Sequence, residues 1–163
     1  MFDVVLYEPE IPPNTGNIIR LCANTGCSLH LIAPLGFDMQ EKRLRRAGLD
    51  YREWVNVRQH DSLDAYLDSI QPAPRLLAFS TRAENDYTSI EYKNGDGLLF
   101  GPETRGLPQQ VLDRVPAARR ARIPMQRGNR SLNLSNAVAI VCYEAWRQHG
   151  FARQPFGGLE ESF

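Results

Sequence analysis

Short apolar runs alternate with helical segments along most of the chain, and this alternation constrains the fold more than any other feature. Several runs are continuously apolar and rich in Val, Leu, Ile and Phe. Such runs are typical of strands buried on both faces, whereas strands with one solvated face alternate apolar and polar residues. The expected strands are residues 2–7, 28–33, 54–57, 76–79, 97–100 and 120–123.

Helical segments separate these runs. In the first, Asn14 or Thr15 is expected to cap the helix, Ile18 and Cys22 lie on one apolar stripe, and Gly26 ends it. The other expected helices are residues 40–49, 62–70, 108–115 and 132–149. Because strands and helices alternate, we expect an α/β fold in which helices cover both faces of a mostly parallel sheet.

The last helix is apolar around most of its circumference. Val138, Ile140, Cys142 and Trp146 do not share one stripe. A helix of this kind is buried on more than one side. We expect one side to face the sheet and the other to face a second subunit, so that the protein is a homodimer. The alternative is that the tail or a neighbouring helix covers the second side.

Length and composition indicate one soluble domain. The chain has 163 residues, of which 42% are hydrophobic and 23% charged. We expect a single domain over residues 1–150 and a flexible tail over 151–163. The sequence shows no signal peptide and no apolar stretch long enough to span a membrane, so we expect a cytosolic protein.

The metal-binding and disulfide patterns are missing. The three cysteines are an odd number without a C-x-x-C pair, so we expect reduced, buried thiols and no metal site. No G-x-G-x-x-G follows the first strand, which argues against a nucleotide-dependent oxidoreductase.

The net charge is zero, but the basic residues are concentrated in two segments. Residues 42–58 hold six basic side chains and two acidic ones, and residues 114–130 hold six arginines and no acid. Guanidinium groups bind phosphate through two parallel hydrogen bonds. The distribution favours contact with a nucleic-acid backbone, although a solvated surface would give the same pattern.

Three polar segments follow expected strands. They are residues 14–20, 100–108 and 123–137. Ligands of open parallel sheets bind beyond the carboxyl ends of the strands, where these segments should meet. Taken singly, each segment also fits a helix cap or a turn.

Together, these segments resemble the signature motifs of the SPOUT-class RNA methyltransferases. The stretches LYEPEIPPNTGN (6–17), RLRRAGLDY (43–51) and FGPETRGLP (100–108) are similar to a small subgroup that methylates the 2′-hydroxyl of the wobble cytidine or uridine in tRNA. The resemblance covers residues 2–150. It implies a deep C-terminal trefoil knot, a homodimer with the knot in its interface, and S-adenosylmethionine as cofactor.

The resemblance also implies a set of site residues. The implied cofactor pocket is formed by Phe79, Ser80, Gly101, Ile123, Met125, Ser131 and Leu132. The implied catalytic residues are Arg20, Asn14, Glu103, Ser131 and Asn133. A guanidinium stays protonated at neutral pH, so Arg20 is either an unusual base or a group that binds phosphate and stabilises the developing alkoxide.

The resemblance also implies a role for the two basic segments. The resemblance implies that the anticodon stem-loop of tRNA, leucine isoacceptors in particular, is bound by Arg43, Arg45, Arg46, Arg127 and Arg130. Two alternatives remain open. The chain could methylate another tRNA or rRNA position, or it could be a catalytically idle RNA-binding protein with this fold.

Overall fold

The computed structural model describes residues 1–38 and 56–152, which form one parallel sheet with helices on both faces. The strands are β1 (Asp3–Tyr7), β2 (Ser28–Ile32), β3 (Val57–His60), β4 (Leu76–Phe79), β5 (Asn85–Asp86), β6 (Gly97–Phe100) and β7 (Arg120–Arg122). The helices are α1 (Pro12–Thr25), α3 (Leu63–Asp68), α4 (Gln109–Leu112) and α5 (Leu134–Gln148), with 3₁₀ turns η2 (Tyr87–Ser89) and η3 (Ala117–Arg119). The predicted α/β class is confirmed.

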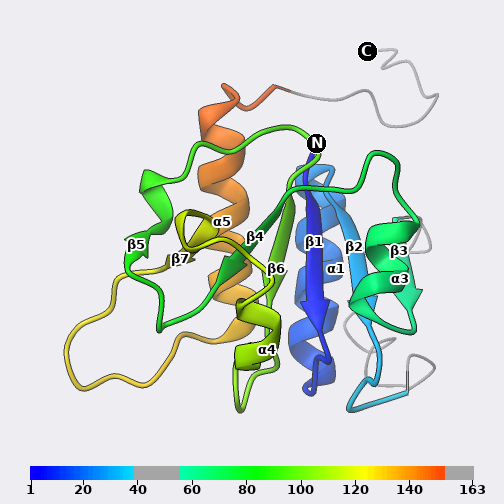
Figure 1. Ribbon diagram of the computed structural model, residues 1–163, viewed down its shortest axis with the longest axis horizontal. Helices are drawn as coiled ribbons and strands as arrows, with labels where there is room; N and C mark the ends of the chain where they lie inside the picture. The colour runs from blue at the N-terminus through cyan, green and yellow to red at the C-terminus, as the bar shows by residue number, and fades with distance from the viewer. Residues whose placement is uncertain (39–55, 153–163) are drawn as a thin grey trace.

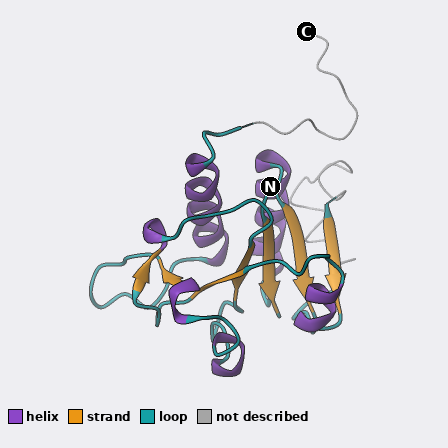
Figure 2. Ribbon diagram, turned by 45° about the horizontal axis from the view of Figure 1, so that its top comes forward, coloured by secondary structure: helices purple, strands orange, loops and turns teal. Residues whose placement is uncertain are grey.

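The strand order is β3-β2-β1-β6-β4-β7-β5, and every neighbouring pair among the described strands is parallel. Helices α1 and α5 cover one face, while α3 and α4 cover the other (Figures 1 and 2). Side chains alternate between the faces accordingly, since Val4 and Leu6 pack with α1 and α5 whereas Val5 packs with α3 and α4.

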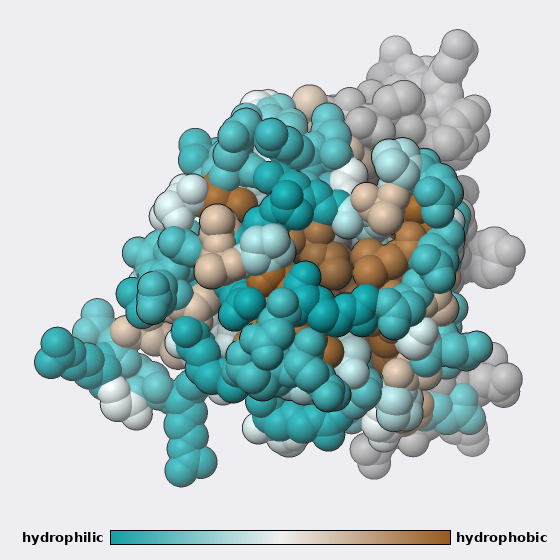
Figure 3. Space-filling model, viewed as in Figure 1, coloured by the Kyte–Doolittle hydropathy of each residue, from teal (hydrophilic) through white to brown (hydrophobic). Residues whose placement is uncertain are grey.

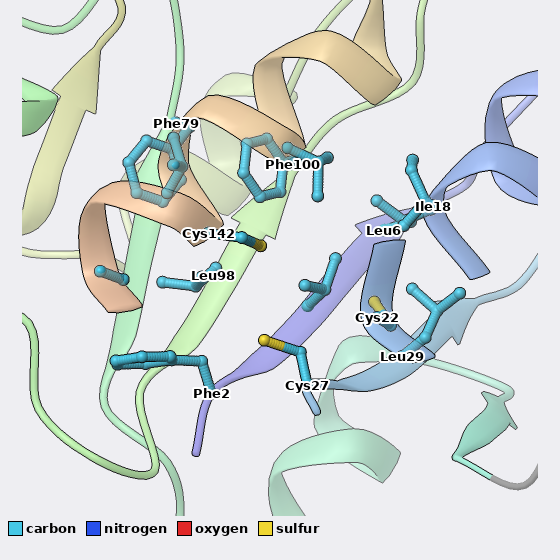
Figure 4. Close-up of a cluster of buried hydrophobic side chains, with 14 of the residues drawn as sticks. Phe2, Leu6, Ile18, Cys22, Cys27, Leu29, Phe79, Leu98, Phe100 and Cys142 are labelled. Atoms are coloured by element: carbon cyan, nitrogen blue, oxygen red, sulfur yellow. The ribbon is translucent and has the colours of Figure 1, made fainter. Parts of the chain in front are cut away.

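The larger core lies between the sheet and the α1–α5 layer (Figure 4). It includes the three cysteines, Cys22, Cys27 and Cys142, which are buried free thiols as predicted. Burial raises the pKa of Cys22 well above its ordinary value, so this thiol stays protonated at neutral pH. The rings of Phe79 and Phe100 stack at the end of the core, with centroids 4.9 Å apart.

Several predicted boundaries are right and others are wrong, among them those of α4, which covers Gln109–Leu112 rather than 108–115. Strands β4 and β6 have the predicted bounds, and Gly26 ends α1 in the left-handed conformation. Strand β3 lies at Val57–His60 rather than at 54–57, because β2 pairs with the polar residues that follow the apolar run. Helix α1 begins at Pro12 after Ile11, so Asn14 and Thr15 lie inside it and do not cap it.

Two further regions bear on the predictions. The two-residue strand β5 and the turn η3 have no apolar periodicity and were not predicted. The predicted helix 40–49 and most of the predicted tail lie outside the described residues.

Helix α5 buries one side against its own chain. Its buried residues are Leu134, Val138, Val141, Cys142 and Ala145. The opposite side carries Tyr143, which is 47% exposed and contacts Trp146 edge to face. The tail does not cover Tyr143 within the described residues, so burial of this side by a second subunit stays a prediction.

The face with α3 and α4 is mainly hydrophilic, with hydrophobic atoms visible in a hollow between the two helices (Figure 3). Beneath it, the buried ring of His30 lies between two polar partners. Its Nδ1 is 2.9 Å from Nε2 of His60, and its Nε2 is 3.6 Å from the carboxylate of Asp3. The hydroxyl of Tyr66 donates to the same carboxylate at 3.2 Å. One hydrogen lies between the two imidazoles, so one ring donates it and the other accepts it.

This pair predicts a loss of stability in mild acid. Burial lowers the pKa of His60, and His30 and Arg58 lower it further, while Asp61 opposes them. His60 therefore binds a proton less tightly in the folded chain than in the unfolded chain. The stability that neutral His60 contributes is complete above the unfolded pKa of about 6.5. It is lost as the pH falls from there through the lower pKa of the folded chain. In urea unfolding at several pH values, His60→Gln should flatten the decline below about pH 6.5. An unchanged slope would contradict this assignment.

Candidate functional site

A cleft of about 510 Å³ opens at the carboxyl edge of the sheet, beside the first turns of α1 and α5. In Figure 1 the arrowhead of β1 and the start of α1 lie at the lower edge, together with the long loop between β7 and α5. The volume lies within the roughly 300–1,000 Å³ range of small-molecule sites. The cleft is lined by residues 79–82, 100–106 and 130–134, and by Ile11, Asn14, Ile123, Met125 and Ala137.

The inner part of the cleft is apolar. The stacked rings of Phe79 and Phe100 form its floor, and both are nearly buried. Ile11 and Leu132 line it as well, and each exposes about two fifths of its surface (41% and 40%). An aromatic floor with exposed apolar side chains suits a flat heterocycle, because stacking and burial both favour it.

Residues 101–106 form one wall of the cleft, and the path of their backbone requires a glycine at position 101. A Cβ on Gly101 would lie 2.2 Å from the backbone nitrogen of Leu107 and 2.4 Å from the carbonyl carbon of Gly106. The atoms packed against position 101 belong to the same loop, so the absent side chain allows the loop to fold closely on itself. Gly106 turns the chain with a φ of 66°.

The carboxylate of Glu103 caps the start of α1. It accepts hydrogen bonds from the backbone nitrogens of Glu10 (2.8 Å) and Ile11 (3.2 Å), and from Nδ2 of Asn14 (3.0 Å). Glu103 thereby orients the amide of Asn14. Because the nitrogen Nδ2 points toward Glu103, the oxygen Oδ1 points away from it and is available as an acceptor.

Asn133 continues this network and caps α5. Its Nδ2 donates to Oδ1 of Asn14 at 2.9 Å, and its Oδ1 accepts from the backbone nitrogen of Ser135 at 2.9 Å. Asn133 is therefore the N-cap of α5. Glu103, Asn14 and Asn133 come from three distant chain segments, and their hydrogen bonds lock two helix N-termini at the cleft. Helix N-termini favour anionic groups, such as a carboxylate or a phosphate.

Most predicted site residues meet here. Those that line the cleft are Asn14, Phe79, Ser80, Gly101, Glu103, Ile123, Met125, Arg130, Ser131, Leu132 and Asn133. Arg20 does not line it, because it lies on the exposed side of α1, about one and two-thirds turns beyond Asn14. Arg127 is exposed and also lies outside the lining. Arg43, Arg45 and Arg46 fall outside the described residues.

Of the lining residues that were not among the predicted site residues, four have aromatic or polar side chains that bear on the site. Phe100, Thr104 and Arg105 line it and belong to the motif at 100–108, so the motif itself was a signal for them. Arg82 lies in a segment without a recognisable pattern, and its guanidinium donates to the backbone oxygen of Leu107 at 2.6 Å.

Residues 1–38 and 56–152 contain no group of three or more His, Cys, Asp or Glu side chains that could hold a metal ion. Across the same residues, no helix is both long and apolar enough to cross a membrane.

A parallel α/β sheet with an apolar cleft at its carboxyl edge, closed by the three signature segments, defines an RNA methyltransferase of the SPOUT class. The chain belongs to the SpoU rRNA methylase family, whose model matches residues 1–143.

Named relatives agree with this assignment. The chain is 59% identical to a tRNA (cytidine(34)-2′-O)-methyltransferase of Yersinia pestis, over 93% of this chain and 96% of the relative. A solved structure concerned with 2-OH methylation of C/U34 on tRNA superposes with a TM-score of 0.86 at 48% identity, over 93% of this chain and 98% of that one. An AdoMet-bound rRNA methyltransferase of Sinorhizobium meliloti superposes with a TM-score of 0.78 at 27% identity, over 90% and 56%.

These comparisons confirm the family resemblance. The predicted enzyme class, a methyltransferase, and the predicted cofactor, S-adenosylmethionine, are confirmed with it. The roles assigned to individual site residues stay predictions.

Proposed function

We propose that this enzyme transfers the methyl group of S-adenosylmethionine to the ribose 2′-hydroxyl of the wobble nucleotide of tRNA, cytidine or 5-carboxymethylaminomethyluridine. The observation that carries the proposal is the convergence of Asn14, Glu103, Ser131 and Asn133 on one cleft. The names of the similar proteins from Yersinia pestis and of the solved C/U34 structure support the target.

The cleft fits the cofactor. Its stacked Phe79 and Phe100 suit the adenine ring, together with Ile123 and Leu132. Ser80, Met125 and Ser131 would complete the pocket around the ribose and the amino-acid end. When bound, S-adenosylmethionine supplies an electrophilic methyl group on a sulfonium.

The chain's own residues must align the 2′-hydroxyl and manage its proton. We assign substrate positioning to Ser131, Asn133 and Asn14, since their polar groups lie together at the cleft. A guanidinium is a cation with five hydrogen-bond donors, so we assign Arg20 to the phosphate beside the ribose and to the developing alkoxide. Glu103 acts through Asn14, whose amide it orients.

The enzyme is proposed to act as a homodimer whose interface includes the outer side of α5 and a trefoil knot in the C-terminal part of the chain. The exposed Tyr143 and its contacts with Trp146 supply an apolar surface for the partner subunit.

The basic residues are proposed to bind the anticodon stem-loop. Arg114, Arg120 and Arg122 each pair with an aspartate. Within the described residues, Arg127 and Arg130 are exposed and have no ion-pair partner, which leaves them available for phosphate. Arg43, Arg45 and Arg46 are proposed to extend this surface, and leucine isoacceptors are the proposed targets on the resemblance alone.

The test is methyl transfer from labelled S-adenosylmethionine to total tRNA that lacks wobble 2′-O-methylation. Nuclease digestion and mass spectrometry then map the product. We expect one 2′-O-methyl group at the wobble nucleotide. Label at another tRNA position, or in rRNA only, would refute the target. Cofactor binding without transfer to any RNA would favour the idle RNA-binding protein.

A further inference from the structure

The wall of the cleft formed by residues 101–106 is fastened to the segment between β1 and α1. Its tip, residues 104–106, is exposed. Inside the loop one backbone hydrogen bond runs from Gly106 nitrogen to the Pro102 oxygen at 2.9 Å. Within the described residues, the side-chain hydrogen bonds and ion pairs of Thr104 and Arg105 lead only to Glu8 and Glu10. The position of the tip therefore depends on these two acids.

Glu10 makes the principal attachment. One oxygen of its carboxylate, Oε2, accepts hydrogen bonds from the backbone nitrogen of Thr104 at 3.1 Å and from its hydroxyl at 2.7 Å. In return, the backbone nitrogen of Glu10 donates to Glu103 at 2.8 Å. Each segment thus gives a carboxylate to the backbone of the other. Such reciprocal bonds fix two loops in register more firmly than either bond alone, because breaking one pair exposes the other.

Arg105 adds an ion pair to this attachment. Its guanidinium bonds the carboxylate of Glu8 and lies 3.6 Å from that of Glu10. The Arg105 side chain is 55% exposed, whereas that of Glu10 is 25% exposed. An exposed ion pair contributes little, since water screens it. The hydrogen bonds to Thr104 are exposed as well, but there are two of them on one carboxylate oxygen and one comes from the backbone, so they fix the position of the tip more closely.

We propose that Glu10 is a positioning residue that sets the affinity for S-adenosylmethionine. It holds residues 101–106 against the cleft in the conformation that binds the cofactor, and it does so through Thr104. A wall fixed before binding lowers the entropic cost of ordering it, so the attachment strengthens binding without touching the ligand. This inference rests on the proposed location of the cofactor in the cleft.

The expected effect appears in cofactor affinity. Isothermal titration of the full-length protein with S-adenosylhomocysteine should show that Glu10→Ala raises Kd about tenfold with the stoichiometry unchanged. Glu10→Gln keeps an oxygen that can accept from Thr104, so its Kd should stay within about threefold of wild type. In steady-state assays, Glu10→Ala should raise KM for the cofactor and leave KM for tRNA unchanged.

A matched control separates this role from a general loss of surface charge. Glu91 is an 83% exposed acid paired with Lys93 at 3.9 Å, so Glu91→Ala should leave Kd unchanged. A Glu10→Ala protein with wild-type affinity would overturn the proposal, as would a Glu10→Gln protein as weak as Glu10→Ala.

The wild-type protein distinguishes this inference from the proposed function. Wild-type binding without methylation of tRNA would refute the proposed function while the comparison of variants still tested Glu10. Absence of wild-type binding would refute the cofactor cleft, and the role of Glu10 with it.

Discussion

Replacing Arg20 by alanine should reduce methyl transfer by about 100-fold or more, because a group that stabilises the developing alkoxide contributes on this order. Affinity for S-adenosylhomocysteine should stay within about threefold of wild type, since Arg20 does not line the cleft of its own chain. Single-turnover rates on tRNA and isothermal titration measure the two quantities. Arg20→Lys should restore little, because an ammonium lacks the planar fork that binds phosphate.

The position of Arg20 predicts which subunit it serves. Asn14 faces the cleft, whereas Arg20 lies on the exposed side of the same helix. In a dimer that uses the neighbouring surface, we expect Arg20 to complete the site of the partner subunit.

A heterodimer tests this arrangement. One chain would carry Arg20→Ala and the other Asn133→Ala, with different tags for purification. If Arg20 acts across the interface, one of the two sites is intact, and the heterodimer should recover about half of the wild-type activity. An inactive heterodimer would assign Arg20 to its own chain. A fully active Arg20→Ala homodimer would remove Arg20 from the mechanism.

The sequence predicted the sheet where strands are buried and failed where they are not. Strands β4 and β6 are central and entirely buried, so their apolar runs match their bounds. Strands β3 and β5 lie at the two edges and contain polar residues, so the apolar pattern misplaced the first and missed the second. Edge strands carry weaker sequence signals because water solvates part of their surface.

The location of the site was predictable from the sequence, but the contacts that its residues make were not. The motifs brought Asn14, Glu103 and Asn133 together because parallel strands deliver their following loops to one edge. That Glu103 caps α1 depends on contacts across about ninety positions of the chain, which no local pattern encodes. The role of Glu10 depends on the same kind of contact.

Gly101→Ala should strongly weaken cofactor binding, and by more than the same change at Gly106 in this loop. The new Cβ would lie 2.2 Å from the Leu107 nitrogen, so backbone must move. Residues 101–106 form a wall of the cleft, and a displaced wall loses its contacts with the cofactor. We expect Kd for S-adenosylhomocysteine to rise at least about 100-fold, or the chain to lose about 3 kcal/mol of stability.

Gly106→Ala is the matched control, because it adds the same methyl group five residues away. A Cβ on Gly106 meets nothing within 4 Å, and the only cost is its left-handed backbone, with a φ of 66°. That conformation costs an alanine about 1 kcal/mol, so Gly106→Ala should bind within about tenfold of wild type. Titration with S-adenosylhomocysteine and thermal unfolding of both variants separate the two cases. A Gly101→Ala protein that matches Gly106→Ala in both measurements would show that the loop relaxes without cost, and that its course does not shape the cleft.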